Sequence, residues 1–283
     1  MIFLSGVVLT LSLSCCRSIE WNHVLGGQFT VVESEHSPFP HHDRRLGHTY
    51  GDSLYSFEAH YSDPSVAIFI PEDYEPEAAI DLVFYFHGWG NNIQNSIEKF
   101  RLLEQFTGSR KNAIFVFPEG PKNAPDSFGG KLEEEDVFKD LVADLFEVLK
   151  QSNIIDEQPL GRIILSGHSG AYRVISYILR GGGVTDHISE VYLFDALYGS
   201  AEIYSHWLNN SAARMINIVT PDGGTYSESH AFCNSLDDRG IPSIKYEGDE
   251  ISREQLRRHR VVTLFITLEH SEVIDPFFQL ALS

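Results

Sequence analysis

The sequence predicts an α/β fold in which helices cover both faces of a mostly parallel central sheet. Short, nearly continuous apolar runs such as Ile80–Phe86 are typical of strands that are buried on both faces. Segments with apolar residues at helical spacing lie between these runs. Strands that alternate with helices imply parallel crossover units. The 283 residues, of which 42% are hydrophobic, suit a large domain of this class.

The N-terminal end resembles a signal peptide. Residues 1–14 are almost all apolar or small, carry no charged side chain and form a run too short to span a bilayer comfortably. The Leu-Ser-Cys-Cys-Arg segment that follows resembles the lipobox of bacterial lipoproteins. We expect residues 1–16 to be a signal peptide with Cys15 or Cys16 as the lipid anchor, or else an ordinary secretory signal. The protein is then exported, as a periplasmic or membrane-anchored lipoprotein or as a secreted protein.

The region after the signal has little periodicity. Residues 17–50 hold several histidines among prolines and arginines, without the matched spacing that holds metal ligands in place. These histidines are His36, His41, His42 and His48. We expect a solvated, poorly ordered connector over residues 17–50, with no metal site, and a single domain over residues 51–283.

The domain is predicted to begin with two short antiparallel strands. Apolar and polar residues alternate from Ser53 to His60, as in a half-buried strand, and a second strand runs from Val66 to Ile70. The central strand Ile80–Phe86 follows. It ends in the turn His87-Gly88-Trp89-Gly90.

Helices and strands alternate in the rest of the chain. Helices are predicted over residues 96–106, 133–149, 174–179, 202–208 and 226–238. Strands are predicted over residues 114–117, 163–165, 191–194, 216–219 and 261–268. No internal repeat or linker divides this pattern into two domains.

Charge and cysteine content exclude some classes of partner and of structure. The net charge of −19 argues against unaided binding to nucleic-acid phosphates and against electrostatic docking on anionic lipid. Outside the signal, Cys233 is the one remaining cysteine, so the mature domain has no internal disulfide. We expect Cys233 to be a small buried hydrophobe.

One turn carries a candidate nucleophile. The strand over residues 163–165 leads into Gly167-His168-Ser169-Gly170-Ala171, and a helical pattern follows. Small residues permit a sharp strand-to-helix turn that exposes the Ser169 hydroxyl above the carboxyl end of the strand. The alternative is a structural serine in a tight turn.

Further polar residues follow other predicted strands. Acyl transfer needs a hydroxyl activated by an imidazole, a carboxylate that orients the imidazole, and donors that face the developing oxyanion. In a parallel α/β sheet such groups collect at the carboxyl ends of the strands. Ser169, Asp195, Asp222 and His270 each stand at such an end.

These motifs resemble the α/β-hydrolase family from about residue 53 to residue 280. The turn around Ser169 is similar to the family's G-x-S-x-G nucleophile elbow, with alanine in place of the last glycine, and the order Ser, Asp, His is the family's. The resemblance implies that Ser169 is the nucleophile and His270 the general base and then acid. The backbone N–H of Gly170 and that of Gly88 or Trp89 would form the oxyanion hole. No metal or organic cofactor is implied.

The identity of the triad acid stays open between two residues. The family usually places the acid after the strand before the histidine strand, which favours Asp222. Some members place it one strand earlier, which favours Asp195, and Asp195 directly follows its strand. We favour Asp195 slightly and expect the other aspartate to form a turn.

The sequence favours a serine hydrolase that acts on a small-molecule or acyl-ester substrate. The same residues would serve an amide or peptide-bond hydrolase, since loops recognise the leaving group. A third hypothesis is a non-catalytic binding module with this fold. Trp89 and Tyr198 stand beside the expected site and are candidates for the pocket lining, with simple loop packing as the alternative.

Overall fold

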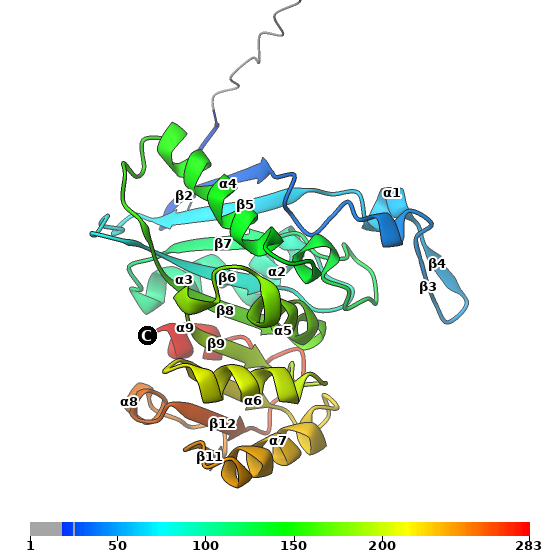
Figure 1. Ribbon diagram of the computed structural model, residues 1–283, viewed down its shortest axis with the longest axis vertical. Coiled ribbons are helices and arrows are strands. Elements are labelled where there is room, and N and C mark those ends of the chain that lie inside the picture. Colours follow the sequence, from blue (N-terminus) through cyan, green and yellow to red (C-terminus); the bar gives the residue numbers. More distant parts are fainter. Residues whose placement is uncertain (1–18, 25) are drawn as a thin grey trace, which may run out of the picture.

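The computed structural model describes residues 19–24 and 26–283 (Figure 1). The predicted signal peptide and its candidate lipid anchors, Cys15 and Cys16, lie outside these residues. Among the helices of the described part, none is long and apolar enough to cross a membrane.

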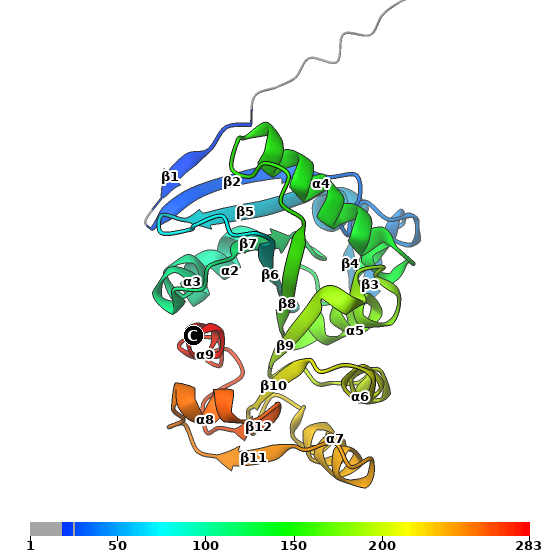
Figure 2. The same ribbon diagram turned by 60° about the vertical axis from the view of Figure 1, so that its left-hand side comes forward.

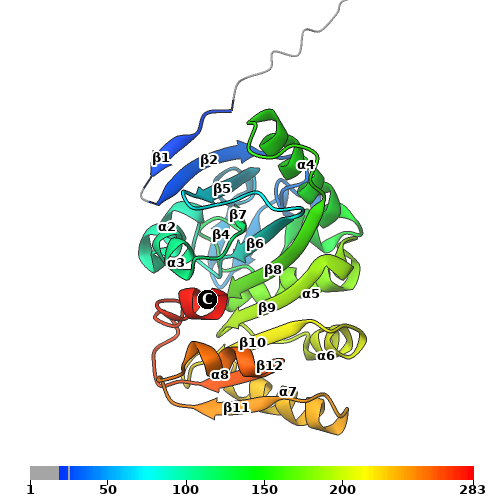
Figure 3. The ribbon, with the colours of Figure 1, turned by 90° about the vertical axis from the view of Figure 1, so that its left-hand side faces the viewer.

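A ten-stranded sheet forms the centre of the described structure, with the strand order β1-β2-β5-β7-β6-β8-β9-β10-β12-β11 (Figures 1 and 3). The strands are β1 (Asn22–Val24), β2 (Gly27–Glu33), β5 (Ser65–Pro71), β6 (Ile80–Phe86), β7 (Ile114–Pro118), β8 (Leu160–His168), β9 (Ile188–Phe194), β10 (Arg214–Val219), β11 (Ile244–Glu247) and β12 (Val261–Phe265). The strands from β7 to β11 in this order run parallel to one another. At the other end of the sheet, β5 pairs antiparallel with β7, β2 with β5, and β1 with β2.

Helices cover both faces of the sheet, as predicted (Figure 2). One face carries α4 (Val137–Gln151), α5 (Tyr172–Gly181), α6 (Ala201–Asn210) and α7 (Tyr226–Asp238). The other carries α2 (Ile93–Phe100), α3 (Leu102–Ser109), α8 (Arg253–Arg258) and α9 (Phe277–Leu282). The continuous apolar runs follow from this arrangement, because successive strand side chains point to opposite faces. Thus the ring of Phe84 packs 4.8 Å from Phe138 of α4, and that of Tyr85 packs 5.8 Å from Phe278 of α9.

The N-terminal region differs from the prediction. The expected connector instead contributes β1 and β2 to the sheet, and β2 pairs with β5 along its whole length. Beyond β2 the chain stays packed on the domain, because the Lys131 N–H donates to the Pro38 carbonyl and Phe39 is fully buried. The prediction of a poorly ordered connector over residues 17–50 is therefore wrong from β1 onward.

Several other elements differ from their predicted form. The alternation from Ser53 to His60 is divided between strand β4 (Ser53–Tyr55) and helix α1 (Phe57–His60). β4 pairs with β3 (His48–Tyr50) in a separate hairpin that projects from the body of the molecule (Figure 1), rather than with β5. The helix predicted over residues 96–106 is broken at Arg101, whose positive φ of 49° separates α2 from α3. Strand β11 and helices α8 and α9 were not predicted.

Candidate active site

Ser169 occupies a sharp turn between a central strand and a helix. Strand β8 ends at His168, and a 3-10 turn over Ser169–Ala171 leads into α5. Ser169 has a positive φ of 54°, a conformation that a residue with a side chain adopts only under local constraint. The small neighbours are required, since a Cβ on Gly167 would lie 2.6 Å from the Cβ of Ala171. This is the predicted strand–turn–helix context of a nucleophile elbow.

His270 and Asp195 form a hydrogen-bonded pair. His270 Nδ1 lies 2.5 Å from Asp195 Oδ2, although the two residues are 75 positions apart in the chain. Asp195 directly follows β9 with a positive φ of 45°, which aspartate tolerates better than most residues. Its carboxylate is fully buried, whereas a third of the His270 side chain is exposed. The pair therefore fixes one imidazole nitrogen and leaves the ring accessible from outside.

The Asp195 carboxylate is surrounded by donors. Thr220 Oγ1 lies 2.5 Å from Oδ2, the Thr220 N–H lies 3.2 Å from Oδ1, and the Thr225 hydroxyl also donates to Oδ1. Burial opposes ionisation, but the hydrogen bonds from His270, Thr220 and Thr225 outweigh it and hold the pKa of Asp195 below its ordinary value. Asp195 is therefore a carboxylate that can orient and stabilise a histidine.

Asp222 lies elsewhere. It is exposed and forms no side-chain hydrogen bond to any residue that the structure describes. Its neighbour Gly223 packs directly on the Asp195 carboxylate, so that a Cβ on Gly223 would lie 1.5 Å from Asp195 Oδ2. Of the two candidates for the acid, Asp195 is the one that contacts His270. The turn that contains Asp222 packs over the Asp195 carboxylate instead.

Two aromatic rings hold His270 in place. The His168 ring lies 4.5 Å from the His270 ring, and its Nε2 donates to the His270 carbonyl at 2.9 Å. Burial, followed by the charge of His270, lowers the pKa of His168 to about 3, so His168 is neutral. On another side the Tyr198 ring is 6.4 Å from His270 in an edge-to-face contact.

Tyr198 also lies beside Ser169, the candidate nucleophile. Its hydroxyl donates to the Gly223 carbonyl, and burial together with the charge of Asp195 raises the pKa of Tyr198 to about 12, an effect that the nearby Ser169 hydroxyl opposes. Tyr198 thus lies close to Ser169, Asp195 and His270, the three candidate triad residues. Within the described residues no hydrogen bond joins the Ser169 hydroxyl to the His270 ring.

The turn after β6 approaches Ser169 closely. A Cβ on Gly88 would lie 2.5 Å from the Ser169 Cβ, so that only glycine allows this approach. The backbone N–H of Trp89 has no acceptor among the described residues. The Trp89 side chain bridges to the next loop, since its Nε1 donates to Ser127 Oγ at 2.7 Å. Gly88, Trp89 and Gly170 therefore lie together around Ser169.

His87 supports this turn from below. Its Nδ1 donates to the Gly88 carbonyl at 2.7 Å, and its Nε2 lies 3.0 Å from Glu119 Oε1. Glu119 is also buried, and its second oxygen accepts from the N–H of Ile93 at the start of α2. The pair His87–Glu119 thus ties the turn to β7 and α2.

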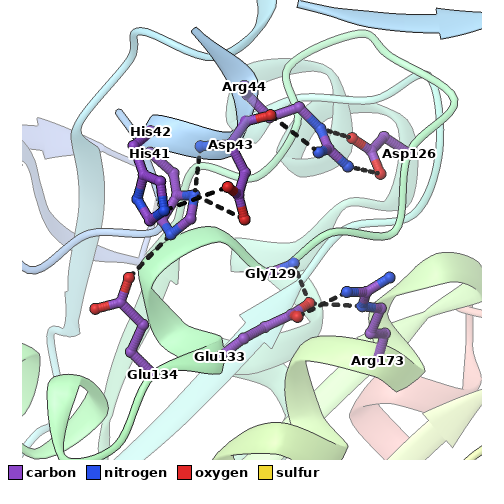
Figure 4. Close-up of polar contacts among 9 residues, drawn as sticks. All are labelled: His41, His42, Asp43, Arg44, Asp126, Gly129, Glu133, Glu134 and Arg173. Carbon is purple, nitrogen blue, oxygen red and sulfur yellow. Dashed lines mark hydrogen bonds and ion pairs between the residues drawn. The ribbon is translucent and has the colours of Figure 1, made fainter.

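The loop over residues 119–130 is held by two ion pairs (Figure 4). Arg44 binds both oxygens of the buried Asp126, at 2.7 and 3.2 Å. Arg173 of α5 binds both oxygens of Glu133, at 2.7 and 2.8 Å, and Glu133 also accepts from the Gly129 N–H. The N-terminal segment and α5 therefore fix this loop from two sides.

One group of residues has potential metal-ligand atoms close together. Ligand atoms of His41, His42 and Asp43 lie within 4.8 Å of one another (Figure 4). However, the Asp43 N–H donates to His41 Nδ1, and His41 Nε2 lies 2.9 Å from Glu134 Oε1. Both nitrogens of His41 are thus used in protein hydrogen bonds. These bonds anchor the segment over residues 41–43 to the turn before α4.

A cavity of about 960 Å³ lies between the C-terminal end of α5 and helix α6. Arg180, Glu202 and Trp207 line it, but none of the residues around Ser169 does. This cavity therefore lies apart from the candidate triad.

Sequence reasoning missed the residues that support the site. Thr220 and Thr225 flank the Pro-Asp-Gly-Gly turn, in which the sequence indicated only Asp222 as a candidate. Glu119 and Ser127 lie in a loop whose Pro/Gly content indicates a turn but not a partner. A buried threonine or glutamate has no sequence signature of its own, so only the contacts identify it.

Comparisons with known proteins agree with this description at the level of fold. No family model matches the sequence, and no curated protein matches it. Among solved structures, a fluorophosphonate-binding serine hydrolase of Staphylococcus aureus superposes with a TM-score of 0.54 at 11% identity, over 91% of this chain and 97% of that chain. A feruloyl esterase module of Clostridium thermocellum gives 0.52 at 12% identity, over 77% and 81%.

A further ferulic acid esterase gives a TM-score of 0.52 at 12% identity, over 77% of this chain and 90% of that chain. At such identities the likeness concerns the fold alone. The chain has the α/β-hydrolase fold.

Proposed function

We propose that this protein is a serine hydrolase that cleaves a carboxylic ester through an acyl-enzyme intermediate. The observation that carries the proposal is the hydrogen bond between His270 and the buried Asp195, which lies at the same sheet edge as Ser169 on its strained turn. A structural serine would need neither the strained turn nor a paired histidine nearby. The structural neighbours are a serine hydrolase and two esterases, which supports the same class.

Each step assigns a role to one of these residues. Ser169 Oγ attacks the ester carbonyl while His270 Nε2 takes its proton, and Asp195 holds the imidazole through Nδ1 and stabilises its positive charge. The oxyanion accepts from the N–H groups of Gly170 and of Trp89 or Gly88. His270 then gives its proton to the leaving alcohol. Water attacks the acyl-Ser169 ester by the same sequence, releases the acid and restores the serine.

The experiment that tests this proposal is covalent labelling with a fluorophosphonate probe. Ser169 of the wild-type protein should displace fluoride from the probe, which leaves a phosphonyl adduct on a peptide that contains Ser169, whereas Ser169→Ala should gain none. A folded wild-type protein that neither labels nor hydrolyses any ester would contradict the proposal and favour a non-catalytic binding module. A panel of p-nitrophenyl esters and peptide anilides would separate an esterase from an amide hydrolase.

The triad acid is tested by two matched substitutions. We expect Asp195→Asn to lower kcat by about 10⁴-fold, because the amide would favour the wrong histidine tautomer. Asp222→Asn should stay near the wild-type rate, since Asp222 is exposed and away from His270. Equal rates for both variants would contradict the role of Asp195, and a large loss in Asp222→Asn alone would reverse the assignment.

We also propose that the protein is exported, on the basis of the apolar residues 1–14. Expression in a bacterium with radiolabelled palmitate, followed by fractionation, tests this. A label that Cys16→Ser or Cys15→Ser abolishes supports a lipoprotein, and an unlabelled, shortened protein in the periplasm or medium supports an ordinary secretory signal. A full-length cytoplasmic protein contradicts export.

A further inference from the structure

The turn over residues 221–224 covers the carboxylate of Asp195. Its Gly223 packs so closely that a Cβ there would lie 1.5 Å from Asp195 Oδ2 and 2.7 Å from Thr220 Oγ1. The two residues that flank the turn, Thr220 and Thr225, donate to the same carboxylate. The turn and its flanks therefore form one side of the Asp195 site, and a shift of the turn would move the acid.

The turn itself has few ties to the rest of the molecule. Three of its four residues are exposed. Its two consecutive glycines, Gly223 and Gly224, give the backbone more conformational freedom than other residues would, and Gly224 has a positive φ of 85°. Among the residues that the structure describes, one hydrogen bond reaches the range 221–224, and Tyr198 donates it. The position of the turn therefore depends on Tyr198.

Tyr198 contacts the turn through both its hydroxyl and its ring. It lies three residues after Asp195, in the segment that follows β9, and its hydroxyl donates to the Gly223 carbonyl. A Cβ on Gly224 would lie 3.3 Å from Tyr198 Cε1, so the ring packs on the turn as well. The same ring meets the His270 ring edge-to-face at 6.4 Å. One side chain thus contacts the turn that covers Asp195 and the histidine that Asp195 holds.

The Tyr198 hydroxyl remains a hydrogen-bond donor at neutral pH. Burial, followed by the charge of Asp195, raises the pKa of Tyr198 to about 12. A neutral phenol has one hydrogen to donate, and the Gly223 carbonyl accepts at every pH. The hydrogen bond to the turn therefore persists wherever a histidine can act as a general base.

We propose that Tyr198 is a positioning residue, which latches the turn over residues 221–224 onto Asp195 and thereby keeps the carboxylate in hydrogen-bonding position for His270. The inference rests on the proposed function, since it assigns a supporting role in the same triad. Tyr198 takes no part in proton transfer, and its effect on the reaction passes through Asp195.

The first test is Tyr198→Phe, which removes the hydroxyl and keeps the ring that packs on His270. We expect kcat for an ester to fall at least about tenfold with little change in KM, because a displaced catalytic group slows the chemical step. A hydroxyl that bound the substrate would instead raise KM, and that result would overturn the proposal. Tyr246→Phe is the matched control, because Tyr246 lies on the edge strand β11, where its ring contacts His259. This control should keep the wild-type kinetics.

A double-mutant cycle with Asp195→Asn separates a positioning role from a merely structural one. If Tyr198 acts through Asp195, Tyr198→Phe should lower kcat by no more than about twofold in the Asp195→Asn background, where the carboxylate is already lost. An equal fall in both backgrounds would overturn the proposal, because Tyr198 would then act on stability or on the substrate directly. A fluorogenic ester provides the sensitivity that the slow Asp195→Asn protein requires.

Hydrogen exchange tests the latch without any need for activity. The peptide that contains residues 220–225 should exchange faster in Tyr198→Phe than in the wild type, and equal exchange would mean that the hydroxyl does not hold the turn. A wild-type protein that labels at Ser169 and hydrolyses esters, with an equal kcat in Tyr198→Phe, overturns the positioning role alone. Absence of both labelling and hydrolysis in the wild type overturns the proposed function, and this inference with it.

Discussion

At the scale of single residues, the site depends on close approaches that few side chains permit. Gly88 lets the β6 turn reach Ser169, and Gly223 lets the following turn cover the Asp195 carboxylate. Asp195 itself is held by three side-chain or backbone groups besides His270, so its position is set more firmly than that of the histidine, a third of whose side chain is exposed. A substitution of Gly223 should therefore affect catalysis by displacing the Asp195 carboxylate.

We expect Gly223→Ala to lower kcat/KM for an ester by about a hundredfold, because displacement of a catalytic group by about 1 Å has this effect. The added Cβ would lie 1.5 Å from Asp195 Oδ2, so the carboxylate must move. Gly199→Ala is the control, because its Cβ would meet Tyr172 at an ordinary 3.4 Å. Steady-state kinetics and thermal unfolding of both variants check this. Wild-type kinetics in Gly223→Ala would show that the carboxylate position does not matter.

The buried His168 gives the protein a specific dependence of stability on pH. Burial lowers its pKa to about 3, below the ordinary value of about 6.5. Between these values the unfolded chain binds a proton that the folded chain does not, so stability falls as the pH decreases below 6.5. The loss through His168 between pH 7 and pH 5 should be about 2 kcal/mol.

His168→Gln should abolish this part of the loss, because a glutamine side chain can donate to the His270 carbonyl without titrating. Urea unfolding at pH 7 and pH 5 measures the difference. The exposed His206 provides the control, since His206→Gln should keep the wild-type dependence. An identical loss in the wild type and in His168→Gln would show that His168 is protonated in the folded protein.

At the scale of elements, an N-terminal segment and a loop far along the chain form one wall of the site. The short turn His42–Arg44 presents Arg44 to Asp126, and the Phe128 N–H donates to the same carboxylate. Burial disfavours the charged form of Asp126, but hydrogen bonds from Arg44 and Phe128 outweigh it and lower its pKa. The pair is therefore a charged contact whose partners depend on each other.

Removal of Asp126 should leave the guanidinium of Arg44 without its partner in a largely buried place. We expect Asp126→Ala to lower the free energy of unfolding by about 3 kcal/mol, because breaking a buried ion pair leaves an uncompensated charge. Glu157→Ala, which breaks the exposed Lys150–Glu157 pair, should cost less than about 1 kcal/mol. Urea unfolding of the two variants gives the comparison. Equal losses would mean that the Arg44–Asp126 pair contributes no more than a surface contact.

At the scale of the whole molecule, stability is concentrated in the middle of the sheet. β6 and β8 lie between other strands and between two helical layers, and their core residues are almost fully buried (Figure 2). β1 and β11 form the two edges, and each exposes part of its residues. The candidate triad stands on β8, on β9 and beyond β12, so it spans the stable centre and extends toward an edge.

Hydrogen exchange should follow this gradient. We expect amides of β6 and β8 to exchange last, because they open only when the whole domain unfolds, and those of β1 and β11 to exchange first. Mass spectrometry of peptides from a native-state exchange experiment checks the order. Early exchange in β8, at the level of β11, would contradict the view that the Ser169 turn stands on the most stable part of the fold.

Local patterns were sufficient to predict much of the fold. Apolar runs and Gly/Pro turns located most strands of the parallel part, and the small residues around Ser169 indicated the strand-to-helix turn. These features depend on residues that are neighbours in the chain. The same local reading failed for β2, whose partner β5 begins more than 30 residues later, and for the hairpin β3–β4, whose alternation extends into α1.

The sequence by itself determined the α/β class and the turn at Ser169, and it indicated His270 and two aspartates as candidates, because each has a signature within a few residues. Only the tertiary structure decided that Asp195 rather than Asp222 lies against His270, that Thr220 and Thr225 hold Asp195, and that Trp89 donates to Ser127 beside Ser169. Such contacts join segments that are separated by 25 to 75 positions, as the bonds of Asp195 show. They depend on strand order and on the direction of each side chain at a strand end, which appear only when the sheet is assembled.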